Sequence, residues 1–228
     1  MRRLLLPLLL LAGCFPRAEV PDVERQKVTR ELEGAPRYLE VAVHVGPFFG
    51  DQTKLLASDQ PFSELELLES PGGQTVSPPP PERVLPPGTP VRIARIEFPT
   101  GWNIARRVVM TPRYHPWAFL EVAGEPRPVI LVLPQELTTF EQVRLELDRY
   151  LAPVDPSPVM RAFPEEQQLA IRAKRLVDDM SPRAVEMAWG YPEKKVIDRP
   201  SNAEEWSWAG GKRHSSFKDG RLARWVPR

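Results

Sequence analysis

Proline is the feature that most restricts how this chain can fold, because 28 of its 228 residues are proline, against a usual share of about 5%. Each proline fixes φ and removes a backbone donor, so long helices and interior strands are excluded wherever prolines cluster. The densest cluster lies in residues 77–87, where four consecutive prolines favour polyproline II. We expect a stiff loop there, with a docking ligand for an aromatic groove as the alternative. The whole chain should consist of short strands, turns and a few helices.

Alternation of apolar and polar residues predicts short strands in the first part of the chain. Apolar residues alternate from Leu39 to Val45, and they recur over 91–98 with a change of parity, as a β-bulge produces. The run 129–133 is apolar throughout and should be covered on both faces. Short strands, turn signals and a bulge together predict a small β-barrel. Further strands are expected at Leu65–Leu67, Ala105–Met110 and Trp117–Val122.

A helix should close this β domain, and a proline-rich linker should follow it. Thr139 and Gln142 have the spacing of a capping box, and the apolar residues that follow fall on one stripe. Residues 153–164 contain four prolines and no apolar periodicity, so we place a domain boundary there. The prediction is a β domain with a terminal helix over 36–152, a linker over 153–164 and a second module over 165–228.

The second module should contain two helices and an antiparallel sheet of three strands, which makes the fold class α+β. The first helix is expected over 165–178. Ser181 is a suitable N-cap for the second helix, with proline at the first helical position and Gly190 as its stop. Trp206 and Trp208 share one face of a strand, and we expect them to fill the seam between sheet and helices. An Asp-Gly pair then predicts a hairpin turn.

The N-terminus has the layout of a secretory signal peptide over residues 1–13, with two arginines, an apolar run and then small residues before the expected cleavage site. The apolar run is shorter than the roughly 20 residues that span a bilayer. Leu11 to Cys14 also resembles the lipobox of bacterial lipoproteins, which implies cleavage before Cys14 and a diacylglycerol on its thiol. Phe15 stands where an aspartate would imply inner-membrane retention, so the resemblance implies the outer membrane. An ordinary signal peptide with a chance cysteine is the alternative. Residues 14–35 are expected to form a lipidated tether.

The charge balance and the chemically reactive residues argue against nucleic-acid binding and catalysis. The chain carries 31 Lys and Arg against 30 Asp and Glu, so no net positive field attracts nucleic acid. The three histidines, His44, His115 and His214, lack metal-ligand spacing. The single cysteine is assigned to lipid, and no phosphate loop or nucleophile motif is present. We therefore expect a non-enzymatic protein without metal or cofactor.

One segment combines aromatic residues with arginine, as protein interfaces do. Trp102, Tyr114 and Trp117 lie near Arg113 in a stretch that prolines interrupt. These four residues are the candidates for partner binding. The alternative is that Trp117 packs with Phe119 in the core of the barrel.

Residues 165–225 resemble the SmpA/OmlA lipoprotein family, which includes the small lipoprotein subunit of the outer-membrane β-barrel assembly machinery. The resemblance rests on Met180-Ser181-Pro182 with a valine one turn later, a Gly-Tyr-Pro stop, a Trp-Ser-Trp sequence and a Phe-Lys-Asp-Gly hairpin. Trp189 stands where the family's helix usually ends on leucine, and the family's small members lack a large preceding domain. The stretch 65–122 resembles a bacterial SH3-like domain, through a Pro-Pro-Gly turn that leads into an apolar strand. Such domains bind cell-wall peptides or protein partners.

The residues and the resemblances together imply an outer-membrane-anchored periplasmic lipoprotein, with an SH3-like small barrel followed by a SmpA/OmlA-like module. We expect a non-enzymatic interaction or scaffold module in envelope assembly, with an envelope protein as its partner. Binding of peptidoglycan through the SH3-like domain and inhibition of a secreted enzyme are the alternatives. The oligomeric state is left open.

Overall fold

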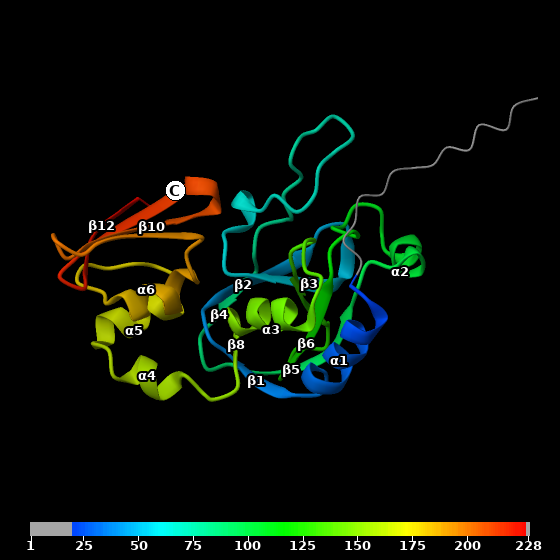
Figure 1. Cartoon of the computed structure of the whole chain (residues 1–228), viewed down its shortest axis with the longest axis horizontal. Coiled ribbons are helices and arrows are strands. Elements are labelled where there is room, and N and C mark those ends of the chain that lie inside the picture. The colour runs from blue at the N-terminus through cyan, green and yellow to red at the C-terminus, as the bar shows by residue number, and fades with distance from the viewer. Residues whose placement is uncertain (1–19, 227–228) are drawn as a thin grey trace, which may run out of the picture.

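The computed structural model describes residues 20–226 and shows an α+β protein whose two domains lie side by side (Figure 1). The first domain is built on an eight-stranded sheet and the second on a four-stranded antiparallel sheet. The predicted signal peptide, Cys14 and the first part of the predicted tether lie outside the described residues. Within residues 20–226, no helix has both the length and the apolar character needed to cross a membrane.

The sheet of the first domain is mixed and curled, in the order β4-β2-β3-β7-β6-β5-β1-β8. Its neighbouring strands pair antiparallel except for β3 and β7, which run parallel. It has more strands than the small barrel expected from the sequence. The strands are β1 (Pro36–Leu39), β2 (Val43–Phe48), β3 (Asp51–Ser58), β4 (Arg83–Leu85), β5 (Pro90–Glu97), β6 (Trp117–Val122), β7 (Val129–Val132) and β8 (Leu151–Ala152).

Two features of this sheet confirm predictions made from local sequence. Val129, Ile130 and Leu131 of β7 are all buried, as the unbroken apolar run predicts. The register between β5 and β6 shifts between Ile93 and Arg95, where the change of parity predicts a bulge.

Two predicted strands are wrong. Residues Ala105–Met110 do not form a strand, because Thr100 starts the helix α2 (Gly101–Arg106) by accepting a hydrogen bond from the Asn103 amide. Residues Leu65–Leu67 instead follow the 3-10 turn η1 (Phe62–Glu64), at the base of a long loop that projects from the domain (Figure 1). In both places a local turn or cap decides the backbone conformation, and apolar spacing does not.

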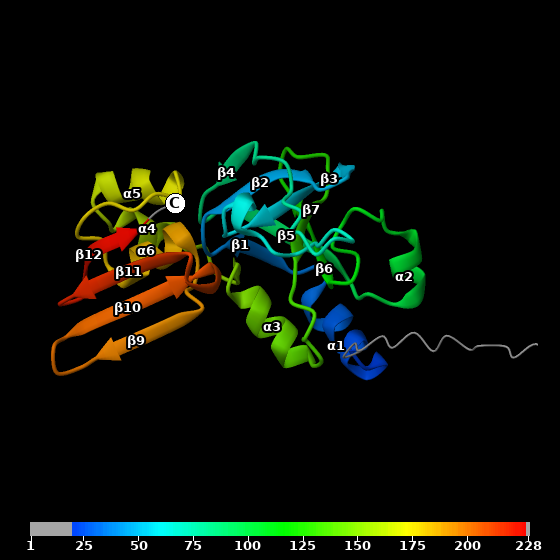
Figure 2. The ribbon, with the colours of Figure 1, turned by 90° about the horizontal axis from the view of Figure 1, so that it is seen from above.

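Two helices lie on one face of the eight-stranded sheet (Figures 1 and 2), α1 (Asp22–Leu32) and α3 (Phe140–Asp148). Val28 and Leu32 of α1 are buried in the core that this face forms. Residues 20–35 therefore belong to the folded domain, where the sequence led us to expect a tether. Thr139 and Gln142 form the predicted capping box at the start of α3.

The second domain packs helices against one face of its sheet (Figure 2). The sheet has four strands, one more than the three predicted, and the short piece expected near Val196 is the full strand β9, which pairs along β10. The first predicted helix ends early, since Lys174 adopts a φ of 52° that does not continue a helix. The elements are α5 (Glu165–Arg172), α6 (Pro182–Trp189), β9 (Lys194–Asp198), β10 (Ala203–Trp208), η2 (Ala209–Gly211), β11 (Arg213–Lys218) and β12 (Arg221–Val226).

The core of this domain confirms the predicted role of its tryptophans. The ring centroid of Trp206 lies 4.5 Å from that of Phe217, and the ring of Trp208 lies 5.4 Å from that of Trp189 on α6. Ser181 caps α6 as predicted, since its hydroxyl accepts a hydrogen bond from a backbone amide in the first turn.

The predicted linker is part of the fold. It contains a short helix, α4 (Ser157–Arg161), and Met160 of this helix is buried in the core of the second domain. The two domains also bond to each other directly, because the Ala42 amide donates to the Met187 carbonyl oxygen at 2.8 Å. An ion pair between Arg183 and Glu40 crosses the same boundary.

Candidate functional site

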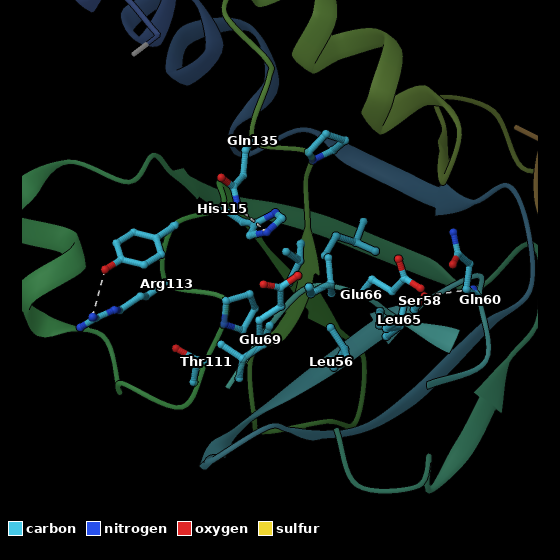
Figure 3. A pocket seen from close by; sticks show the side chains of 18 of the residues that line it. Leu56, Ser58, Gln60, Leu65, Glu66, Glu69, Thr111, Arg113, His115 and Gln135 are labelled. Carbon is cyan, nitrogen blue, oxygen red and sulfur yellow. Dashed lines mark hydrogen bonds between the residues drawn. The ribbon is translucent and has the colours of Figure 1, made fainter. Parts of the chain in front are cut away.

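A cleft of about 900 Å³ opens on the first domain beside the second (Figure 3). Residues 58–60, at the end of β3, and 134–136, after β7, both line it. Since β3 and β7 are parallel, their carboxyl ends meet at one edge of the sheet, which is where open α/β sheets commonly bind ligands. The other walls come from residues 65–71, residues 109–115, the end of α3 and Glu193 of the second domain.

The cleft combines apolar contacts with an excess of acidic side chains. Leu56 and Leu65 are buried beneath it, while Val109 and Met110 are 65% and 48% exposed at its edge. Ligand sites generally pair an apolar surface with a few polar groups, and the volume is within the usual range of about 300–1,000 Å³. The charged side chains that line the cleft are six acids and two arginines: Asp59, Glu66, Glu69, Glu136, Glu146, Glu193, Arg113 and Arg149.

The loop between α2 and β6, which forms one wall, is held in place by the buried side chain of Arg107. Its guanidinium donates to the carbonyl oxygens of Arg113 and His115 at 2.9 Å and 2.8 Å. It also lies over the ring of Trp117, 3.7 Å from the centroid. Burial lowers the pKa of Arg107 to about 10, and Glu97 beside it opposes this change, so the guanidinium stays charged at neutral pH. This wall of the cleft is therefore fixed in position before any ligand arrives.

Two polar pairs lie along the same wall (Figure 3). The Nδ1 of His115 lies 2.9 Å from the Leu133 carbonyl oxygen, and its Nε2 lies 2.8 Å from the amide nitrogen of Gln135. These contacts fit a neutral imidazole that donates through Nδ1 and accepts at Nε2. Arg113 donates to the Tyr114 hydroxyl at 3.0 Å and stacks over its ring.

One lining residue, Asp59, also belongs to a group of buried charges between the two domains. Asp59 follows β3, Lys174 follows α5 and Arg213 begins β11, and the exposed fractions are 4%, 8% and 3%. The Lys174 ammonium donates to the carbonyl oxygens of Ala42 and Ala188 at 2.7 Å and 2.9 Å. These two acceptors belong to different domains, so Lys174 connects the domains.

Removal from water shifts the pKa values in this group. Burial lowers the pKa of Lys174 to about 7, a shift that Asp59 opposes and Arg213 reinforces. Burial raises the pKa of Asp59, against the opposing charges of Lys174, Arg149 and Arg213. The Arg213 Nε lies 3.1 Å from the Glu64 carboxylate as an ion pair. Among the described residues, the Oδ1 of Asp59 has no hydrogen-bond partner.

The four predicted partner-binding residues lie in three different environments. Arg113 and Tyr114 line the cleft. Trp117 is 2% exposed, and its ring centroid lies 6.3 Å from that of Phe119, so it belongs to the core, as the alternative interpretation held. Trp102 is 71% exposed on α2 and does not line the cleft.

Sequence reasoning missed the charges that meet between the domains. Asp59 offered a signal, because it directly follows an apolar strand, and carboxylates at such ends often contact ligands. Lys174 offered none, since a lysine after a helix is usually a surface residue. Glu69 and Glu136 also read as surface charges, and only the folded chain brings them to one cleft.

In comparisons with known proteins, no family model, curated protein or solved structure matches this chain.

Proposed function

We propose that this protein is an outer-membrane-anchored periplasmic lipoprotein that works as a non-enzymatic protein-interaction module and holds a partner in the cleft. The lipobox-like sequence before Cys14 supports the anchor. The observation that carries the proposed function is the cleft itself, which combines a preorganised wall, apolar contacts and a local excess of acids. Apolar anchors surrounded by polar groups are typical of protein interfaces.

The place of this module in envelope assembly rests on the resemblance to the SmpA/OmlA family. We propose that residues 165–228 are a SmpA/OmlA-like module, and that residues 36–152 are an SH3-like domain enlarged by additional strands. The packing of two helices on an antiparallel sheet, with tryptophans in the seam, supports the first part of this proposal. A scaffold also benefits from domains that are fixed to each other, as the hydrogen bonds of Lys174 to both domains support.

Site-specific photocrosslinking in intact cells tests the proposed function. A photoreactive phenylalanine derivative at Gln135 or Glu69 would lie in the cleft, while the same group at Ala223 would lie exposed on β12 of the second domain. We expect the two cleft positions to form a covalent adduct with one envelope protein, and an excess of the unmodified chain to compete this adduct away. Absence of an adduct from both cleft positions, or an equal adduct from Ala223, would contradict the proposal.

The anchor has a separate test. Mass spectrometry of the native protein should find a diacylglyceryl group on an N-terminal Cys14. The substitution Cys14→Ser should move the protein from the membrane fraction to the soluble periplasmic fraction, because stable attachment needs two or more acyl chains. An unmodified thiol on the native protein would refute the anchor.

A further inference from the structure

We infer that the cleft binds an extended polypeptide segment in which lysine or arginine side chains alternate with apolar ones. This inference rests on the proposed function, because it names the ligand class of the same cleft. It is carried by the charge of the acids on the rim and by the apolar contacts among the lining residues.

The negative charge of the cleft is a local property. The whole chain has a formal net charge of only +1, whereas six acids and two arginines line the cleft. A cleft lined by one sign of charge raises the local concentration of ligands of the opposite sign. A cationic ligand therefore fits this cleft better than an anionic one.

Three of the acids form no ion pair within the described part of the chain, although the Glu193 carboxylate accepts a hydrogen bond from the Gly210 amide at 2.8 Å. Glu66 pairs with Lys212 at 2.5 Å and Glu146 with Arg149 at 3.6 Å, so their charges are compensated. Within residues 20–226, the other carboxylates on the rim form no ion pair, and they come from three separate segments: Glu69, Glu136 and Glu193. Acids on three sides of a cleft suit several cationic side chains better than one small cation.

The apolar surface of the cleft points to a polypeptide rather than a polyamine. Val109 and Met110 remain largely exposed at the edge of the cleft, and methionine adapts its shape to varied partners. Leu67 and Leu68 are only partly buried on the facing loop. Apolar side chains of a peptide, and the aliphatic stems of lysine and arginine, would cover these residues.

Asp59, at the base of the cleft, does not attract the ligand. It is 4% exposed, its Oδ1 is buried, and Lys174, Arg149 and Arg213 lie around it. The attraction for a cationic ligand therefore comes from the acids on the rim.

The test measures binding of synthetic peptides to the full chain in detergent by fluorescence anisotropy. The probe is a labelled hexapeptide of alternating lysine and leucine, and the comparison peptides replace every lysine by glutamate or by glutamine. The cleft variant combines Glu69→Gln, Glu136→Gln and Glu193→Gln. The matched control carries the same change of charge on exposed acids of the second domain, through Glu166→Gln, Asp178→Asn and Glu205→Gln.

We expect the lysine peptide to bind, with an affinity that falls as salt is added. The cleft variant should bind it roughly tenfold more weakly, as the loss of three exposed charge contacts implies, and the control variant should bind like the original chain. Equal binding by the two variants, stronger binding of the glutamate peptide, or no binding of the lysine peptide would overturn the inference. If the cleft still crosslinks an envelope protein in cells, the ligand class alone has failed; if it does not, the proposed function has failed as well.

Discussion

The substitution Gly190→Ala tests whether the second domain sits against Asp59 as closely as the structure indicates. Gly190 ends α6 with a φ of 87° and a ψ of 175°, a conformation that is nearly restricted to glycine. A Cβ atom at this position would lie 2.1 Å from the Asp59 Oδ2 and 2.8 Å from its Cγ. Because Asp59 is buried beside Lys174, Arg149 and Arg213, its carboxylate has little room to move aside.

Two effects add up to the expected loss of stability. The backbone conformation costs a side-chain-bearing residue about 1–3 kcal/mol, and overpacking of a close contact costs about 1–3 kcal/mol more. Gly190→Ala should therefore lower the free energy of unfolding by about 4 kcal/mol. Gly124→Ala is the matched control, because its φ is 80° but no atom lies within 4 Å of the added Cβ. It should cost only the backbone part, about 1–2 kcal/mol.

Urea unfolding of the purified chain, followed by tryptophan fluorescence, measures both values. The double mutant Gly190→Ala with Asp59→Ala should cost less than the sum of the single mutants, since truncation of Asp59 removes the two closest atoms. The reasoning is refuted if Gly190→Ala costs no more than Gly124→Ala, or if the two mutations at the contact are additive.

Further predictions concern a buried lysine, two tryptophans and a helix cap. Burial lowers the pKa of Lys174 to about 7 in the folded chain, against an ordinary value of 10.5. Between pH 7 and pH 10 the unfolded chain therefore holds a proton on Lys174 that the folded chain has lost. The free energy of unfolding should rise by about 4 kcal/mol from pH 7 to pH 10. Urea titrations across this range should show the rise in the original chain but not in Lys174→Met. Trp117→Ala should lower the free energy of unfolding by about 3–5 kcal/mol, whereas Trp102→Ala should change it by less than about 0.5 kcal/mol. Similar losses of stability in the two variants would refute the assignment of Trp117 to the core and Trp102 to the surface. Thr139→Ala should cost about 1 kcal/mol, because it removes the hydroxyl that accepts from the Gln142 amide; an unchanged urea midpoint would contradict the capping role.

Features set by a few neighbouring residues could be predicted from the sequence. The capping box of α3, the Ser181 cap and the bulge in β5 all depend on residues within one or two turns of each other. The Asp219-Gly220 hairpin also forms as predicted, with φ values of 51° and 71°. Each of these conformations depends on neighbouring residues and not on how distant parts of the chain pack, so the sequence pattern is enough to predict it.

Features set by distant residues could not be predicted. The parallel pairing of β3 with β7 joins strands that are far apart in the sequence, and no local pattern specifies it. The clustering of charges around Asp59 and Lys174 could not be predicted either, because each residue taken alone resembles a surface charge. Arg113 and Tyr114 were predicted from composition and line the cleft, but composition did not separate them from Trp117, whose ring is buried.

Hydrogen exchange of the native complex tests the central claim most directly. The measurement compares the full chain alone with the full chain bound to the envelope protein that the cleft captures. We predict slower exchange in three cleft segments, residues 66–70, 109–114 and 135–136, with little change along the exposed strand β9. Slower exchange confined to the second domain, with unchanged exchange in all three cleft segments, would contradict the account.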